Sequence, residues 1–432
     1  VTWDIAKLVL PVGEPLRDLH LRFEKEDSLL RMPYLRFVAP QGGVGRASGA
    51  AVVSGIHLVA ATADVDLHYA SLDVQQLLAM LASLKPPNKT VDSQPRAVVL
   101  AARRARQQAH RRARHRQAGS PSPAGALLAS GGLTAVLRVQ ADQVRYNSIA
   151  GGRFQLVSHL SPGEARVDAC SLDAFEGRIT LHGLLRTDGG RQHHPLQVQA
   201  LLEDIKLPDL FATANTMRFQ VFTHENIRGS LRCVAALRTD LDSTFLPVRE
   251  QTFGYVKADL RDLELLNVEA LEQAFKFVKK ERTSHLFFEP VSTEFLLNGG
   301  QVLIPSLKLN SNLTELEVSG RYGLDGRTNL YVGMNPLNVL FGNNKRRIER
   351  IQSGEPMRPR SPRLTYVNLR RDVPGTKYQV KLFQKNEQQQ QQTTLRQQCR
   401  QLLRTQRLDT TMHLLPHTRS ITGPGSKAAT MP

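Results

Sequence analysis

The sequence predicts a mainly β protein: an elongated, curled antiparallel sheet, groove-like and repeat-built, with a few short amphipathic helices. Through most of the 432 residues, short runs alternate apolar and polar residues, the period of a strand with one buried face. Turn-forming Gly, Asn and Asp residues separate these runs. A strand followed by a docking segment recurs from Val65, Leu201, Ala258 and Leu330, which favours a degenerate repeat over a chance likeness among Leu-rich segments.

Residues 1–92 form a first β-rich segment. Val65, Leu67 and Tyr69 alternate with polar residues, as a strand requires. Apolar residues then recur at helical spacing over 72–84, before two prolines that end helices, so we expect a short helix there. The uncharged run 47–63 is shorter than the roughly 20 apolar residues of a membrane span, and we predict strands for it.

Residues 93–131 interrupt the pattern as an Arg-rich insert. Residues 103–116 hold seven arginines and two histidines, and the flank that follows is rich in Ser, Pro, Gly and Ala. Such a block repels itself and buries nothing, which predicts a disordered, solvated linker. Binding of nucleic acid or phospholipid headgroups by this run is the alternative.

Residues 132–342 form the main β region, and its clearest part runs from Gly254 to Phe341. The apolar phase of its first strand slips by one after Asp262, which predicts a bulge. Asn267 then reads as the N-cap of a helix that extends to about Lys279. Its apolar face is made by residues at helical spacing: Val268, Leu271, Phe275 and Val278.

Further strands follow this helix, with turns at Asn298–Gly300 and at Asp325–Gly326. We expect one apolar row of this region to line a groove: Val256, Ala258, Leu260, Phe295, Leu297, Val302 and Ile304. Such a row would hold acyl chains, because each buried methylene gains about 0.8 kcal/mol. Two sheets closed on each other as a sandwich or barrel are the alternative.

The C-terminal part reads as a basic, proline-punctuated extension with last strands (343–385) and a Gln-rich, basic tail (386–432). In the tail, Leu395, Cys399, Leu402 and Leu403 fall on one helical face. Arg396, Arg400 and Arg404 lie beside that face, as in a helix on an anionic membrane surface. A solvated tail helix is the alternative.

Charge and chemistry exclude several classes of function. The net charge of +18 is concentrated in the insert and the tail, which disfavours a folded nucleic-acid module, and we expect no nucleic-acid partner. Three dispersed cysteines make no disulfide framework or metal site, and Cys233 reads as a core thiol. Because the sequence holds none of the common catalytic motifs, we expect no enzyme, no cofactor and no metal.

The region from Phe253 to Gly342 resembles the C-terminal region of the AsmA family, within the AsmA/TamB group of Gram-negative envelope proteins. The likeness rests on four stretches: the strand and helix opening of Ala258–Leu271, the run Leu296–Ser311 with its Asn-Gly-Gly turn, the turn region Gly320–Asp325, and Asn335–Phe341. Looser similarity, which includes Asp204–Phe211, extends back to about Gly132, and the segment 1–92 is also similar to the family. These motifs are structural and degenerate, so they indicate a family.

The resemblance implies a non-enzymatic periplasmic protein that transfers phospholipid or supports outer-membrane biogenesis. The implied partners are phospholipid acyl chains, the inner or outer membrane, and envelope assembly proteins. It also implies an inner-membrane anchor, here upstream of Val1 and outside this chain. Two features depart from the family pattern: the usual N-terminal transmembrane helix does not occur in this sequence, and the Arg-rich insert is unusual. A closed β scaffold without lipid transport is the alternative function.

Overall fold

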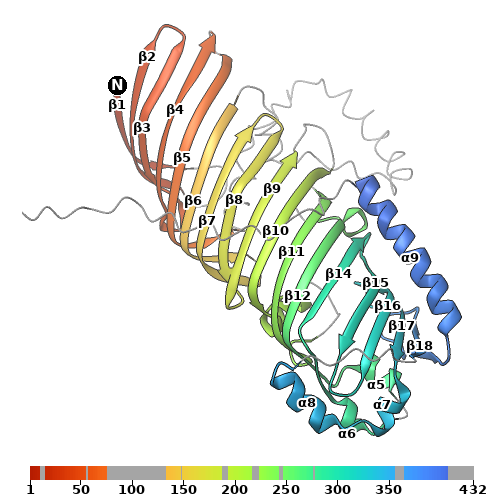
Figure 1. Ribbon diagram of the computed structural model, residues 1–432. Coiled ribbons are helices and arrows are strands. Elements are labelled where there is room, and N and C mark those ends of the chain that lie inside the picture. Colours follow the sequence, from red (N-terminus) through yellow and green to blue (C-terminus); the bar gives the residue numbers. More distant parts are fainter. Residues whose placement is uncertain are drawn as a thin grey trace, which may run out of the picture.

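The protein forms one long, open, curled sheet of nineteen strands (Figure 1). The computed structural model describes residues 1–9, 15–54, 57–74, 133–146, 148–186, 193–216, 223–242, 247–275, 278–355 and 364–406. The mainly β fold class is confirmed. The Arg-rich insert and residues 407–432 lie outside the described residues, as does most of the helix expected at 72–84. Strand β5 already occupies the first two positions of that expected helix.

The strands follow one another across the sheet almost in sequence order. They are β1 (Thr2–Leu8), β2 (Leu16–Glu26), β3 (Leu29–Val38), β4 (Val44–Ser54), β5 (His57–Asp73), β6 (Leu133–Tyr146), β7 (Ile149–Ser161), β8 (Glu164–Ala174), β9 (Gly177–Arg186), β10 (His194–Lys206), β11 (Ile227–Leu241), β12 (Phe253–Leu266), β13 (His285–Phe287), β14 (Val291–Asn298), β15 (Gln301–Asn310), β16 (Glu315–Gly323), β17 (Thr328–Met334), β18 (Thr365–Arg371) and β19 (Gln379–Lys381).

Every neighbouring pair is antiparallel except β5 and β6, which pair in parallel across the Arg-rich insert. A parallel pair needs a crossover connection, because the chain must return to the edge where the first strand began. The strands expected within 47–63 and within the 343–385 extension are confirmed as β4, β5, β18 and β19. The sheet does not close on itself.

Six helices lie among the described residues: α4 (Leu207–Thr216), α5 (Glu269–Ala274), α6 (Lys280–Thr283), α7 (Pro336–Phe341), α8 (Asn344–Gln352) and α9 (Lys385–Gln406). Helices follow β10, β12 and β17, which are three of the four repeat positions expected from sequence. These strands and β5 run in the same direction. Strands β5 and β6 are parallel, and an even number of antiparallel pairings separates β6 from each of β10, β12 and β17. Their C-terminal ends therefore share one edge, which we call the helix-bearing rim (Figure 1).

Bulges bend the strands at residues with left-handed backbone. The phase slip expected at Asp262 is confirmed: its φ is 52°, and the β11–β12 register shifts there. Asp204 and Arg153 have φ of 55° and 49° at register shifts of β10 and β7. Bulges increase local twist, which suits a curled sheet. The expected hairpin turn between β14 and β15 is also confirmed, with Gly299 and Gly300 both at positive φ.

The helix expected from Asn267 to about Lys279 is shorter and broken. The structure has α5 over Glu269–Ala274, a break, and then α6 from Lys280. Asn267 is not its N-cap: it has φ of 48°, and Val268 occupies the cap position without a side-chain hydrogen bond. Asn tolerates left-handed backbone, which accounts for the residue type.

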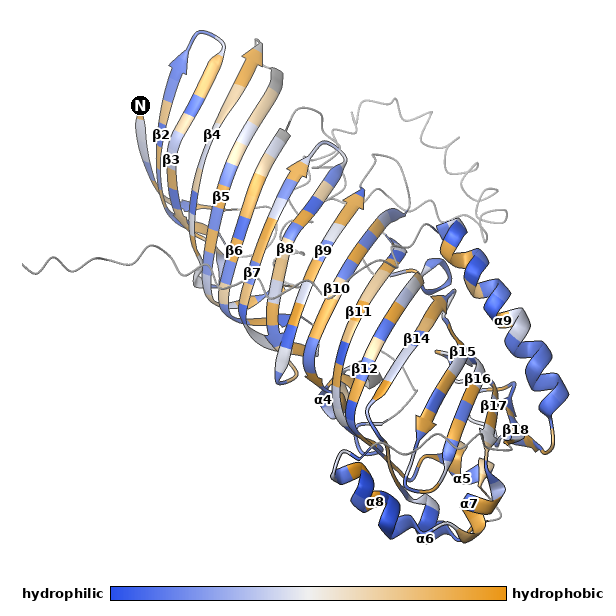
Figure 2. Cartoon of the chain, in the orientation of Figure 1, coloured by the Kyte–Doolittle hydropathy of each residue, from blue (hydrophilic) through white to orange (hydrophobic). Residues whose placement is uncertain are grey.

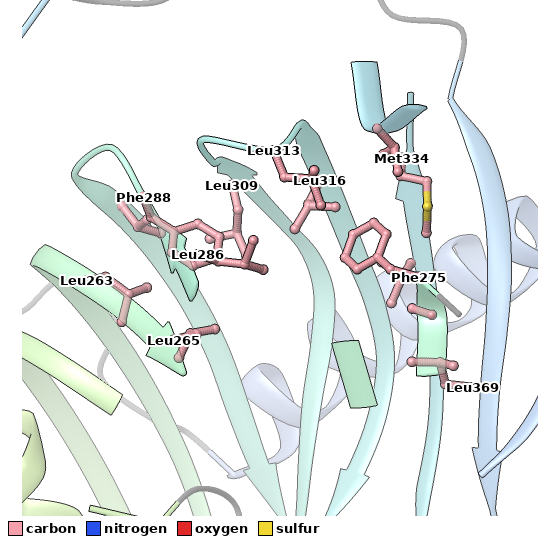
Figure 3. Close-up of a cluster of buried hydrophobic side chains, with 14 of the residues drawn as sticks. Leu263, Leu265, Phe275, Leu286, Phe288, Leu309, Leu313, Leu316, Met334 and Leu369 are labelled. Carbon is pink, nitrogen blue, oxygen red and sulfur yellow. The ribbon is translucent and has the colours of Figure 1, made fainter. Parts of the chain in front are cut away.

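The expected apolar face of that helix does dock on the sheet. Phe275 is 1% exposed, and Val268, Leu271 and Val278 pack beside it. Phe275 points in among Leu316, Met334 and Leu369 (Figure 3). The cluster that surrounds it, which we call the rim core, draws on α4, α5, α7 and the strand ends at the helix-bearing rim.

Helix α9 packs on the opposite face of the sheet. Leu395 and Cys399 are buried against Tyr255, Leu296 and Leu303, which are register partners on β12, β14 and β15. The Gln-rich run that we placed in a tail instead forms the first turns of this helix. Gln388 is buried and donates to Ser319 Oγ at 3.3 Å, and Arg321 donates to Gln398 Oε1 at 2.9 Å. At 22 residues, α9 is longer than the short helices expected.

Candidate functional site

An unbroken apolar row crosses nine strands on one face of the sheet. Each member is the register partner of the next, from β5 to β14: Leu67, Val139, Leu156, Cys170, Leu181, Ala200, Ala235, Val256 and Phe295. Register partners on adjacent strands point to the same face. These side chains therefore form one continuous track, which we call the cross-strand row.

A second track runs parallel to this row. Its members are also register partners, from β8 to β14: Leu172, Ile179, Leu202, Cys233, Ala258 and Thr293. Along each strand the two tracks are two residues apart, and the residues between them point to the other face. Alternating hydrophobic and hydrophilic segments along the strands are visible in Figure 2. The face therefore carries an apolar band several residues wide.

All seven residues expected to line a groove lie on this face. Val256 and Phe295 are register partners, as are Leu297 and Val302. Ala258, Leu260 and Ile304 follow at two-residue steps along the same strands. Val256 and Ala258 are buried, whereas the other five are half-buried. Leu260 also packs against the rim core, so it marks where the band meets the packed end.

Among the described residues, the centre of the band is lined by strand side chains alone. Ala200, Cys233, Ala235, Val256 and Ala258 form one buried cluster, and the partly buried side chains packed against it come from β9, β10, β11 and β14. At the helix-bearing rim the same face is instead filled by the rim core. Within the part of the chain that the structure describes, the band therefore has one end filled by the rim core and a central stretch that only strands border.

The seven residues predicted from the sequence to line a groove cover only the β12–β15 part of this band. Leu67, Val139, Leu156, Leu181 and Ala200 belong to it as well. Their alternation with polar neighbours was visible, but the bulges and turns that align them across strands were not. Cys170 lies in the row and Cys233 in the second track, and burial raises their thiol pKa values to about 11 and about 12. Both thiols are therefore protonated and unreactive near neutral pH.

The opposite face carries charged side chains over β5–β8 and apolar ones such as Leu201 and Val234 over β10 and β11. Arg138 donates to Asp64, and Arg166 Nε donates to Asp168 Oδ1 at 2.8 Å. Burial opposes ionisation of Asp168, but hydrogen bonds from His159 and Arg166 outweigh it and lower its pKa. A shallow cavity of about 670 Å³ opens on this face between β8 and β11, beside the last residue of α9.

Arg396, Arg400 and Arg404 are exposed on α9. The apolar face beside them is occupied by the sheet, since Leu395 and Cys399 are buried there and Leu402 and Leu403 pack against the same cluster. These arginines therefore present charge without an adjacent free apolar face. Their contact with an anionic surface stays a prediction.

Within the parts of the chain that the structure describes, His, Cys, Asp and Glu nowhere gather in a group able to hold a metal ion. In the same parts, no helix combines the length and apolar character needed to cross a bilayer. Comparisons of the chain with protein-family models, with curated proteins and with solved structures give no match.

Proposed function

We propose that this protein is a non-enzymatic lipid-handling protein whose curled sheet holds phospholipid acyl chains along the cross-strand row. The row carries the proposal, because it runs apolar and without interruption across nine strands, whereas the opposite face carries charged side chains over β5–β8 and is covered by α9 over β12–β15. An acyl chain has no hydrogen-bonding needs, and each methylene buried there gains about 0.8 kcal/mol. A long apolar band can hold the full length of an acyl chain, whereas a compact pocket would hold only part of it.

The likeness of residues 253–342 to the AsmA family supports the same function. It adds the expectation of a periplasmic, envelope-located protein that transfers phospholipid or supports outer-membrane biogenesis. The partners proposed on this basis are phospholipid, the inner or outer membrane and envelope assembly proteins.

Photocrosslinking tests the proposal with matched positions. A photoreactive residue at Phe295 or Val256 should attach phospholipid in cell extracts. The neighbouring Glu294 and Lys257 are exposed on the other face and serve as controls. Lipid mass spectrometry of the purified chain should recover bound phospholipid. No label at Phe295 and Val256, together with lipid-free protein, would rule the function out.

A β scaffold without lipid transport is the second candidate. The rim core favours it, because that end of the face is filled by buried side chains from α4, α5 and α7. A scaffold predicts that crosslinkers at Phe295 and Val256 capture protein or nothing. The same experiment therefore separates the two functions.

A further inference from the structure

Helix α7 exposes an apolar face at the helix-bearing rim. Leu337, Leu340 and Phe341 are 67%, 44% and 80% exposed. They stand at positions i, i+3 and i+4 of the helix, so they share one side of it. Such large apolar side chains normally avoid water when they are contiguous, and their clustering marks a contact surface.

The helix that carries them is held in place from below. Val339 is 0% exposed and packs into the rim core, on the side away from the exposed face. Asn335 caps the helix by accepting from the backbone of Leu337 and Asn338. Leu337, Leu340 and Phe341 are therefore displayed by an anchored element.

Arg282 of α6 fixes the turn after α7. Its guanidinium donates to Leu340 O at 2.7 Å, to Gly342 O at 2.8 Å and to Asn344 Oδ1 at 2.9 Å. This clamp ties α6, α7 and the start of α8 together on both sides of Phe341. The position of Phe341 is thus set by three hydrogen bonds that leave its ring outside.

Cations are frequent in the two segments that adjoin α7. The segments 278–284 and 341–352 contain seven Lys and Arg residues against two Glu. Lys279, Lys280, Lys345 and Arg346 are exposed. Figure 2 shows α7 as a hydrophobic coil next to the hydrophilic α6 and α8. An apolar tip beside two basic segments matches the layers of an anionic bilayer surface, whose phosphates lie outside its acyl chains.

We infer that the tip formed by Leu337, Leu340 and Phe341 inserts into an anionic lipid surface and docks this end of the sheet on a membrane. This deepens the proposed function, because it names the surface from which or to which the cross-strand row would pass lipid. A protein partner fits less well: a stable interface buries about 800 Å² on each side, far more than three side chains of a six-residue helix offer.

A fluorescent reporter tests the docking directly. Trp3 is the one tryptophan of the chain, so Phe341→Trp in a Trp3→Phe background gives a single signal. Its emission should shift to shorter wavelength with vesicles of phosphatidylcholine and phosphatidylglycerol, and brominated lipid should quench it. Tyr34→Trp in the same background is the matched control, because Tyr34 is 45% exposed and lies on β3, many strands away from β17 and α7. Its emission should stay unchanged.

Two further variants measure each contribution by vesicle co-sedimentation. The triple change Leu337→Ser, Leu340→Ser and Phe341→Ser should weaken vesicle binding at least about tenfold, since apolar area drives insertion. Lys345→Gln with Arg346→Gln should weaken binding about fivefold per charge on anionic vesicles and leave phosphatidylcholine vesicles unaffected. All substituted positions are exposed, so circular dichroism should show an unchanged fold.

The outcomes separate docking from lipid handling. A triple variant that loses vesicle binding but is still labelled by lipid at Phe295 supports the docking tip. Wild-type protein that is labelled at Phe295 but binds no vesicles overturns docking alone. Equal shifts at Phe341→Trp and Tyr34→Trp also overturn it. A vesicle-independent shift at Phe341→Trp that grows with protein concentration overturns it too, and means that the tip joins two copies of the chain.

Discussion

At the scale of single residues, the bend of the sheet depends on a few unusual backbone positions. Gly229 of β11 has φ of 116°, which is accessible to Gly and strained for any other residue. A Cβ there would lie 2.6 Å from Arg261 O and 2.7 Å from Asp262 O, at the bulge of β12. The absence of a side chain at Gly229 is therefore what lets the bulge of β12 fit against β11.

We predict that Gly229→Ala lowers the free energy of unfolding by about 3 kcal/mol, through strain and steric overlap together. Gly42 provides the control, because it also has positive φ but nothing within 4 Å of an added Cβ. Gly42→Ala should cost only about 1 kcal/mol, the strain alone. Urea unfolding measures both, and equal losses would contradict the steric part.

The buried thiol of Cys233 predicts a loss of stability at high pH. Burial raises its pKa from 9.0 to about 12, so between these values the unfolded chain loses a proton that the folded chain keeps. The free energy of unfolding should therefore be unaffected by this thiol below pH 9 and fall as pH rises towards about 12. Cys233→Ala should flatten that fall, and urea unfolding across this pH range checks it. An identical alkaline slope in the variant would show that other groups cause the loss.

At the scale of elements, the apolar face of α9 could be predicted from the sequence, but the surface of the sheet on which it docks could not. The apolar face of Leu395 and Cys399 is evident from spacing. Its docking site was not, because Tyr255, Leu296 and Leu303 sit between residues of the opposite face and looked like breaks in alternation. Asn267 shows the converse. Its residue type suggested a helix N-cap, whereas the position favours an Asn because its backbone is left-handed.

We predict that Leu395→Ala loosens α9 from the sheet. Leu395 is fully buried, so its truncation should reduce the docking free energy by about 3 kcal/mol. Amide hydrogen exchange within α9 should then accelerate by about two orders of magnitude, while exchange in β6–β8 stays unchanged. Gln397→Ala, two residues away on the exposed side, is the control. Equal acceleration in both variants would mean that α9 is not held by this face.

At the scale of the whole molecule, strands were predictable and their alignment was not. Alternation and turn residues are local signals, so the β class, the bulge at Asp262 and the Gly299 turn could be expected. The parallel pairing of β5 with β6 depends on a long insert, and the cross-strand row depends on every bulge between β7 and β12. Neither the parallel pairing nor the row can be predicted from any short stretch of sequence. The seven residues predicted to line a groove, all on β12–β15, are therefore only part of the band.

A charge placed in the middle of the row tests its continuity. Leu181 is half-buried on the apolar face, and Thr180 beside it is half-buried on the other face. Leu181→Glu should reduce co-purified phospholipid at least about tenfold, because a carboxylate among acyl chains is costly to desolvate. Thr180→Glu should leave lipid content unchanged. Lipid mass spectrometry with a melting curve for each variant provides the comparison, and equal lipid content would argue against a continuous path.

The almost sequential order of the strands has a consequence for how the chain reaches this shape. Most strands pair with the strand just made, so the sheet can grow one hairpin at a time, at the low loop-closure cost of local contacts. Helix α9 is different: the Arg238 guanidinium donates to Gln406 O across 168 residues. The apolar patch under α9 therefore stays open to water until that helix has been synthesised. During this interval the exposed patch makes the growing chain most prone to aggregation. Docking of α9 ends the interval, because it covers the patch.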